Sequence, residues 1–336
     1  MRRPAGAGAA LRHSLHAAWR HLVVGTLLLV PGVPRSRRRR VERRLRGREE
    51  QRKIAEAEVL LVSFGKSGRT WIRLMLSRFY QKRFGLPAGS FLEYDNLHRL
   101  DPAIPRVFFT HGNYLRDYTG HWDHKCDFHG KRIVLLVRDP RDVAVSQYFQ
   151  WKNRMHPHKK WLNDYPPHGA AISLFDFVAW HPAGLTRMIE FLNLWSAELS
   201  HLEEVLVVRY EDMRRDPHAA LGRILGFLGT PPQAEELRDA VDFAAFDNMR
   251  RLEQEGGVRA RGRRLVPGRG GSHDAYKVRR AKVGGWRDYF DPAQQALLDA
   301  RVAAELSPGF GYTPAETEGG APGGAGEGRC SSSATV

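Results

Sequence analysis

Cysteine is scarce in this sequence: the 336 residues contain two, Cys126 and Cys330. So few cysteines rule against a disulfide scaffold or a cysteine zinc site, and they suit the reducing cytoplasm. We therefore predict a cytoplasmic protein that depends on a buried core. The apolar content of 42% is ordinary for such a protein.

Long apolar runs are lacking as well. The run at residues 22–30 is far shorter than the ~20 residues that a membrane-spanning helix needs. It also sits late for a signal peptide, and the arginines that follow it oppose translocation. The sequence therefore predicts neither a membrane span nor a secretory leader.

Positive charge is concentrated at the amino end. Residues 1–53 hold 15 Lys and Arg against 3 Asp and Glu, which accounts for +12 of the net charge of +16. We expect an arm that is disordered or partly helical. Its apolar run and arginine cluster are also consistent with peripheral contact with an anionic membrane. Nucleic-acid binding is a third and less favoured interpretation, which would make the chain a non-enzymatic polyanion-binding protein.

Strand-like and helix-like segments alternate after this arm. Apolar runs at 59–63, 107–111, 132–138 and 205–209 read as strands, and periodic segments between them, such as 69–84, read as helices. This alternation predicts a single α/β domain over residues 54–312, with a mostly parallel sheet, helices on both faces and a P-loop-like character. We expect a mobile lid at 255–274, an ordered insertion loop at 152–172 and a disordered tail at 313–336.

The first strand leads into a loop that suits an anion. Gly65-Lys66-Ser67-Gly68-Arg69-Thr70 combines glycines, a lysine and hydroxyls with the exposed N–H groups of a helix start. The nucleotide triphosphatase signature would need a glycine at position 60, which is Leu60. No apolar strand ends in an Asp placed for magnesium. A nucleotide kinase is therefore disfavoured, although an anion cradle with a lysine remains.

Three further segments carry candidate site residues. Arg138 ends a buried strand and Ser146 lies in the helix that follows, so the two can grip one phosphate. His111 stands where another strand leaves the sheet, which is where ligands of α/β proteins bind. The stretch 278–286 forms a cationic strip with glycines. Each signal alone is weak, since such an arginine or histidine is more often structural.

Together these segments make the sequence resemble a sulfotransferase that uses 3′-phosphoadenosine 5′-phosphosulfate (PAPS). Residues 63–71 resemble the 5′-phosphosulfate loop of that family, and 132–146 resemble its 3′-phosphate motif. Thr110-His111 matches the pair that carries its catalytic histidine, 208–213 its Tyr-Glu-Asp-Met segment, and 279–286 its late cationic strip. The resemblance covers roughly residues 57–310 in the right order.

The resemblance implies a role for each matched residue. His111 is the general base, Lys66 stabilises the leaving phosphate, and Ser146 assists at the 3′-phosphate. The implied cofactor-binding residues are Lys66, Ser67, Gly68, Arg69, Thr70, Trp71, Arg138, Ser146, Tyr210, Phe246, Arg279, Arg280 and Ala281. No metal is expected, because side-chain cations already meet the anion.

Several positions depart from the family pattern. Arg69 replaces the first threonine of the loop and adds a cation, while Ala281 replaces a glycine of the strip. The expected acceptor is a small molecule, a glycan or a lipid with a hydroxyl or amine, because the aromatic residues of 151–165 suit a sugar, a phenol or a lipid. The family's short dimer motif would begin at Arg287 and is not matched, so the sequence does not predict an oligomeric state.

Overall fold

The computed structural model describes residues 32–255 and 276–313. The strands are β1 (Val59–Ser63), β2 (Val107–Thr110), β3 (Arg132–Val137) and β4 (Glu204–Arg209). The helices are α2 (Arg35–Glu56), α3 (Arg69–Arg83), α4 (Leu115–Thr119), α5 (Pro140–Asn153), α6 (Pro157–Leu162), α7 (Leu174–Ala179), α8 (Leu185–Glu198), α9 (Tyr210–Arg215), α10 (Pro217–Phe227), α11 (Ala234–Phe243), α12 (Phe246–Gln254) and α13 (Pro292–Glu305), with short 3-10 turns η1 (Cys126–Phe128), η2 (Leu199–His201), η4 (Gly285–Tyr289) and η5 (Pro308–Phe310).

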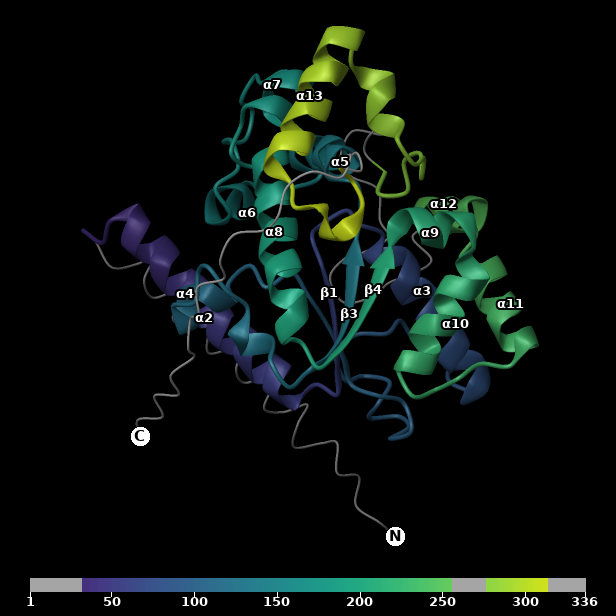
Figure 1. The fold of residues 1–336 in the computed structure, drawn as a ribbon. Coiled ribbons are helices and arrows are strands. Elements are labelled where there is room, and N and C mark those ends of the chain that lie inside the picture. Colours follow the sequence, from purple (N-terminus) through teal and green to yellow (C-terminus); the bar gives the residue numbers. More distant parts are fainter. Residues whose placement is uncertain (1–31, 256–275, 314–336) are drawn as a thin grey trace.

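The four strands form one parallel sheet in the order β2-β1-β3-β4. Side chains of β1 alternate between two cores, as the two-residue period of a strand requires. Val59 and Leu61 pack with α3 and α10 on one face, whereas Leu60 and Val62 pack with α5 and α8 on the other. Figure 1 shows α8 and α2 on one side of the sheet and α3, α10 and α11 on the other. The predicted α/β architecture is confirmed.

The predicted strands lie within one residue of the observed ones. Each strand could be predicted from a continuous run of apolar residues, because the strands of a parallel sheet are buried on both faces. An Asp-Pro pair begins α5: the Asp139 carboxylate accepts a hydrogen bond from the backbone N–H of Arg141 at 2.9 Å, and Pro140 is the first helical residue. Residues 152–172 contain the short helix α6 within the expected loop.

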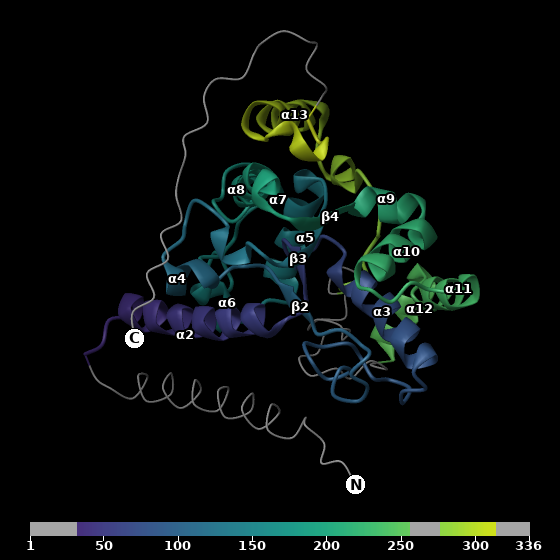
Figure 2. The ribbon, with the colours of Figure 1, turned by 60° about the horizontal axis from the view of Figure 1, so that its bottom comes forward.

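The amino-terminal arginines form an ordered helix. Arg35–Glu56 is α2, which lies beside α4 (Figure 2). Its partners on the body include Asp117, which accepts from Arg43 at 2.8 Å, and His158, 3.0 Å from Glu42. The segment 1–53, for which the sequence predicts disorder or partial helix, thus contains a helix that is docked on the body, and Ile54 is a buried residue near the end of that helix. The sequence does not reveal the docking because the partners of α2 lie far along the chain.

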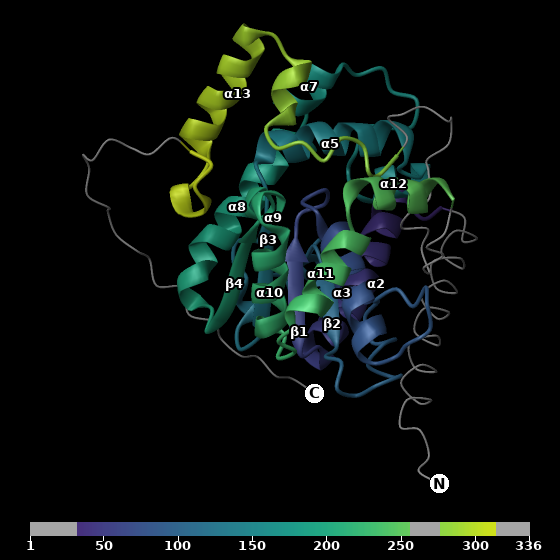
Figure 3. The same ribbon diagram turned by 90° about the vertical axis from the view of Figure 1, so that its right-hand side faces the viewer.

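The rest of the expected arm, residues 1–31, lies outside the described residues, as do the expected lid and tail apart from residues 255 and 313. Among the described residues, no helix combines the length and the apolar character that crossing a membrane requires. The strands point their carboxyl ends toward α5 and the segment before α13 (Figure 1). Figure 3 shows α5, α7 and α13 grouped beyond that end of the sheet.

The contact between α2 and α4 depends on a glycine. A Cβ atom at Gly47 would lie 2.2 Å from the carbonyl oxygen of Tyr114 and 2.7 Å from the Cβ of Tyr118. Because backbone cannot yield as a side-chain end can, we expect Gly47→Ala to lower the free energy of unfolding by about 1–3 kcal/mol, although alanine favours helices. Urea denaturation followed by circular dichroism measures this change.

Gly226 in α10 is the matched control, because a Cβ there meets nothing within 4 Å. Gly226→Ala should leave the free energy of unfolding unchanged or raise it by about 0.5–1 kcal/mol. Equal effects of the two substitutions would contradict the close α2–α4 packing.

Candidate functional site

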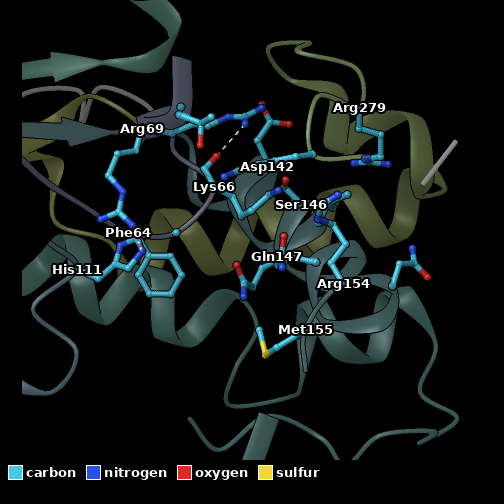
Figure 4. Close-up of a pocket in the computed structure, with 18 of the residues that line it drawn as sticks. Phe64, Lys66, Arg69, His111, Asp142, Ser146, Gln147, Arg154, Met155 and Arg279 are labelled. Atoms are coloured by element: carbon cyan, nitrogen blue, oxygen red, sulfur yellow. Dashed lines mark hydrogen bonds and ion pairs between the residues drawn. The ribbon is translucent and has the colours of Figure 1, made fainter. Parts of the chain in front are cut away.

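A cavity of about 1110 Å³ opens at the carboxyl ends of the strands. The residues that follow three of the strands line it: Lys66 after β1, His111 after β2 and Arg138 after β3. Parallel strands bring their carboxyl ends to one edge, and α/β proteins bind ligands there. Figure 4 shows Lys66 between His111 and Phe64 on one side and Arg279 and Arg154 on the other.

The loop after β1 turns sharply into α3. Lys66 has a φ of 76° and Gly68 a φ of 96°, both in the left-handed region. A Cβ at Gly68 would lie 2.7 Å from the Cδ2 atom of Tyr210, so the loop needs glycine there for space as well as conformation. Lysine in this conformation is strained, which is typical of residues that a binding loop holds in place. The turn presents the first N–H groups of α3 to the cavity.

Lys66 lies among other cations. Desolvation in the cavity, and then the positive charges of Arg154, Arg279 and Arg138, lower its pKa to about 7. Its ammonium group is therefore only half populated near neutral pH. A bound anion would reverse both effects, because it adds negative charge beside the amine. The site thus has an electrostatic preference for a multiply charged anion.

His111 is held between two hydrogen-bond partners. Its Nδ1 lies 2.5 Å from the carbonyl oxygen of Ser63, and its Nε2 lies 2.5 Å from Nη2 of Arg69. Because the carbonyl can only accept, we assign the proton to Nδ1 and the lone pair to Nε2, where Arg69 donates. Burial, followed by the charge of Arg69, lowers the pKa of His111 well below its usual value. The imidazole is therefore neutral near pH 7, as a general base must be.

The loop that carries His111 is fixed by Glu50 of α2. The Glu50 carboxylate accepts hydrogen bonds from the Thr110 hydroxyl and from the backbone N–H of Tyr114, the latter at 3.2 Å. Thr110 in turn accepts from the N–H of Gly112 at 2.9 Å. Burial raises the pKa of Glu50, whereas these hydrogen bonds lower it. The sequence does not mark Glu50 as a site residue, because Glu50 stands in a basic segment 60 residues before its partner Thr110.

Arg138 connects the loop to the late strip. It donates to the carbonyl oxygens of Lys66 and Lys282 at 3.2 and 3.1 Å, and its guanidinium lies 4.1 Å from the centroid of the Tyr210 ring. Nε of Arg138 is buried with no hydrogen-bond partner among the described residues. The guanidinium is therefore firmly placed while retaining a donor for a ligand. Ser146 lines the same cavity from α5.

Asp142 fastens the strip to α5. Its carboxylate accepts from the backbone N–H groups of Gly284 and Trp286, both at 2.9 Å, and pairs with Arg138 at 3.2 Å. The predicted strip residues differ in orientation: Arg279 lies 3.9 Å from the Phe149 ring centroid, whereas Arg280 pairs with Asp288 on the exposed side at 2.6 Å. Asp142 belonged to a recognised motif, but its reach to a segment 142 residues away was not readable from the sequence.

Aromatic side chains form another part of the wall. Trp71 and Tyr210 meet edge to face with ring centroids 6.2 Å apart, and Arg214 lies 5.4 Å from the Trp71 ring. Phe246, from the start of α12, lines the cavity as well. Such rings suit a flat heterocycle.

All but one of the predicted site residues line the cavity. Those that line it are Lys66, Gly68, Arg69, Thr70, Trp71, His111, Arg138, Ser146, Tyr210, Phe246, Arg279, Arg280 and Ala281. The exception is Ser67, whose side chain is buried beneath the loop. The lining also contains cations that the sequence analysis did not single out, among them Arg116, Arg154, Arg187 and Lys277. No motif marks these positions.

A group with metal-ligand chemistry lies outside this cavity. The ligand atoms of His121, His124 and Cys126 fall within 4.8 Å of one another between α4 and η1. None of the three lines the cavity, so this group supplies nothing to the chemistry at its centre.

The chain is similar to known proteins over most of its length. Residues 56–308 match the model of a family described as sulfotransferase domain. Cytosolic sulfotransferase 13 of Arabidopsis thaliana is 25% identical over 277 residues, covering 75% of this chain and 77% of that protein. Sulfotransferase 2A6 of Rattus norvegicus is 24% identical, covering 76% of this chain and 87% of that protein.

Solved structures with a similar arrangement include mouse sulfotransferase SULT7A1 complexed with PAP. It is 19% identical, with a TM-score of 0.49, and the match covers 74% of this chain and 84% of that one. A retinol dehydratase in complex with androsterone and PAP is 18% identical, with a TM-score of 0.45. That match covers 73% of this chain and 80% of the retinol dehydratase chain.

The lowered pKa of Lys66 is directly measurable. In the protein with ¹³C-methylated lysines, we expect the resonance of Lys66 to titrate near pH 7. Lys66→Arg should remove that resonance, which assigns it. Arg279→Gln should raise the pKa of Lys66, because it takes away a neighbouring positive charge. A Lys66 resonance that titrates with the surface lysines would contradict the crowding of cations around this side chain.

Proposed function

The chain belongs to the sulfotransferase domain family and is a PAPS-dependent sulfotransferase, and we propose that His111 is its general base and that the loop around Lys66 binds the phosphosulfate group. The observation that carries this assignment is the meeting of three strand ends at one cation-lined cavity. A neutral histidine, a lysine loop and a strand-terminal arginine stand there together. PAPS supplies the sulfonate group, and the acceptor supplies a hydroxyl or an amine.

The donor site divides between two phosphate positions. Lys66, Gly68, Thr70 and the N–H groups at the start of α3 would hold the 5′-phosphosulfate. Arg138, Ser146 and Arg279 would hold the 3′-phosphate, with the N–H groups of the strip kept nearby by Asp142. Trp71, Tyr210 and Phe246 would enclose the adenine. Arg280 faces Asp288, so we assign it a weaker part in binding than the sequence pattern suggests.

The transfer itself needs a base and a stabilised leaving group. The acceptor oxygen or nitrogen forms a bond to sulfur while the bond from sulfur to the bridging oxygen breaks. The acceptor proton passes to Nε2 of His111, and the electron pair stays on the leaving 3′,5′-adenosine bisphosphate (PAP). The protonated Lys66 offsets the charge that develops on the bridging oxygen. Positioning in the closed cavity supplies much of the remaining rate gain.

The assay is transfer of ³⁵S from labelled PAPS to a panel of hydroxyl and amine acceptors, with PAP released in equal amount. A thermal-shift comparison of PAP with ATP separates this function from that of a kinase, because PAP has a 3′-phosphate and lacks the γ-phosphate. Stronger stabilisation by ATP than by PAP would contradict the proposal.

His111→Ala tests the base. We expect the turnover number to fall by about 10²–10⁴-fold, because no other group would take the proton, while the affinity for PAP by calorimetry stays within a fewfold of the wild-type value. Glu235→Ala, at an exposed site on α11, is the control. Turnover by His111→Ala near the wild-type level would overturn the assignment.

Arg138→Ala tests the 3′-phosphate position. The variant should lose at least tenfold in affinity for PAP and far less for adenosine 5′-monophosphate, because only PAP has the group that Arg138 would meet. Calorimetric titration of both nucleotides gives the two ratios. Equal losses would place the 3′-phosphate elsewhere.

The acceptor class and the location are also part of the proposal. The relatives named cytosolic support a cytoplasmic enzyme. A small-molecule acceptor is in keeping with the name of one relative, the 3-alpha-hydroxysteroid sulfotransferase of Cavia porcellus. Membrane contact through residues 1–53 remains a prediction. Within that segment, α2 has partners on the body of the enzyme, among them Asp117.

A further inference from the structure

The cavity holds more positive charge than PAPS can neutralise. Fourteen Lys and Arg line it, against the two carboxylates Asp142 and Asp164. Three further carboxylates pair with lining cations: Asp117 with Arg43, Glu253 with Arg154, and Asp288 with Arg280 and Lys282. PAPS carries about four negative charges, two of them on its 3′-phosphate. Among the described residues, the lining Lys and Arg side chains therefore outnumber these five carboxylates and the four charges of PAPS taken together.

Part of this excess lies in a group of arginines from three separate elements. Arg43, Arg116 and Arg187 line the cavity. Burial, followed by the charges of Arg43 and Arg187, lowers the pKa of Arg116, and the carboxylates of Asp117 and Glu190 offset only part of that shift. Arg187 donates to the carbonyl oxygen of Asn163 at 2.8 Å and lies 5.3 Å from the Tyr165 ring. Arg43 donates to the carbonyl oxygen of Leu162 at 2.9 Å. The folded protein thus holds the positive charges of Arg43, Arg116 and Arg187 together in the lining of the cavity.

Arg116 is the member of this group with unused donor capacity. Its Nε is buried without a hydrogen-bond partner, and among the described residues no carboxylate lies within 4 Å of it. Its guanidinium packs 4.7 Å from the Trp122 ring, which places it without neutralising it. Asp117 and Glu190 raise the pKa of Arg116, but neither carboxylate forms a hydrogen bond or an ion pair with it among the described residues. A partly buried guanidinium whose Nε has no partner is unfavourable, because burial removes water that would solvate the group. An acidic ligand group would supply the missing partner.

Arg69, which lines the same cavity, covers the base. Its Nη2 lies 2.5 Å from Nε2 of His111 and so occupies the lone pair that must accept the acceptor proton (Figure 4). Transfer therefore requires Arg69 to move off Nε2. A guanidinium exchanges a neutral imidazole for a carboxylate or phosphate readily, because charge-assisted hydrogen bonds are about twice as strong as neutral ones.

We propose that the acceptor is itself an anion: a hydroxyl or amine compound with a carboxylate or phosphate group, which Arg116 and Arg69 bind while Arg69 leaves Nε2 of His111. This inference rests on the proposed function and names the substrate class of the same site. The proton, the new bond to sulfur and the leaving PAP follow the transfer step given above. Arg69 thereby couples recognition of the acidic group to exposure of the base.

Matched acceptors test the substrate class. The panel contains methyl glucuronide against methyl glucoside, glucose 6-phosphate against glucose, and 4-hydroxyphenylacetate against its amide. Turnover of ³⁵S-PAPS should favour the acidic member of a pair by at least tenfold in kcat/KM. The carboxylate and phosphate pairs distinguish the two sources of negative charge. Preference for the neutral members, or an acidic panel without a substrate, overturns the inference.

Arg69→Thr tests the coupling. We expect this variant to lose at least tenfold in kcat/KM for the acidic acceptor and to gain in kcat for its neutral counterpart, because the base is no longer covered. Arg116→Gln should raise KM for the acidic acceptor at least tenfold and change kcat little. Arg215→Gln, whose side chain is 77% exposed, is the matched control and should change neither constant. An acidic preference that survives in Arg69→Thr overturns the role of Arg69.

The pKa of His111 gives a readout independent of turnover. Because Arg69 lowers it, the pKa measured by ¹⁵N nuclear magnetic resonance should rise when PAP and the acidic acceptor are both present. A rise with PAP alone would mean that the donor, and not the acceptor, moves Arg69, which overturns the coupling. Calorimetric binding of PAP in the same samples shows whether the donor site is intact, so failure here is distinct from failure of the proposed function.

Discussion

Crowding of positive charge around the loop after β1 is the constraint on which this site depends. The backbone holds Lys66 in a left-handed conformation. Burial, and after it the charges of Arg154, Arg279 and Arg138, lowers the pKa of its amine to about 7. Such an arrangement is unfavourable without an anion, so the rest of the fold must keep it from opening. Asp142 does so from α5 by pairing with Arg138 and binding the N–H groups of the strip. An anion then relieves a repulsion that folding has already imposed, which gives the site its affinity for a phosphorylated ligand.

The second half of the site depends on a helix outside the region that the family model matches. Most of α2 precedes residue 56, where the match to the family model begins, yet its Glu50 fixes the loop that carries His111. Arg43 from the same helix lines the cavity beside Arg116 and Arg187. The charge that dominates the amino end of the sequence therefore serves the enzyme's own cavity in part. Glycine at position 47 allows the close approach, because any side chain would meet the backbone of Tyr114. One helix thus supports the loop of His111 and contributes a cation to the lining of the cavity.

Much of the fold and of the donor site could be predicted from the sequence. The strands are continuous apolar runs, and Asp-Pro pairs begin several of the helices. The loop around Lys66 and the strand end at Arg138 are short patterns of neighbouring residues, so they can be identified without knowledge of the rest of the fold. The direction in which a long side chain points depends on residues far along the chain, so a local sequence pattern does not predict it. Arg69 was expected at a phosphate and lies against His111, and Glu50 and Asp142 act on segments far along the chain. Ser67 was expected at the ligand, but the sharp turn of the loop buries its side chain. These outcomes depend on three-dimensional neighbours that no spacing encodes.

The most direct test of the account is a crystal structure of the enzyme with PAP. The account predicts the 5′-phosphate on the N–H groups at the start of α3, with Nζ of Lys66 within hydrogen-bond distance. The 3′-phosphate should meet Arg138 and Ser146, and the side of the cavity at His111 should stay open for the acceptor. PAP bound away from Lys66, or with its 3′-phosphate directed into solvent, would contradict the claim that the crowded cations form the donor site.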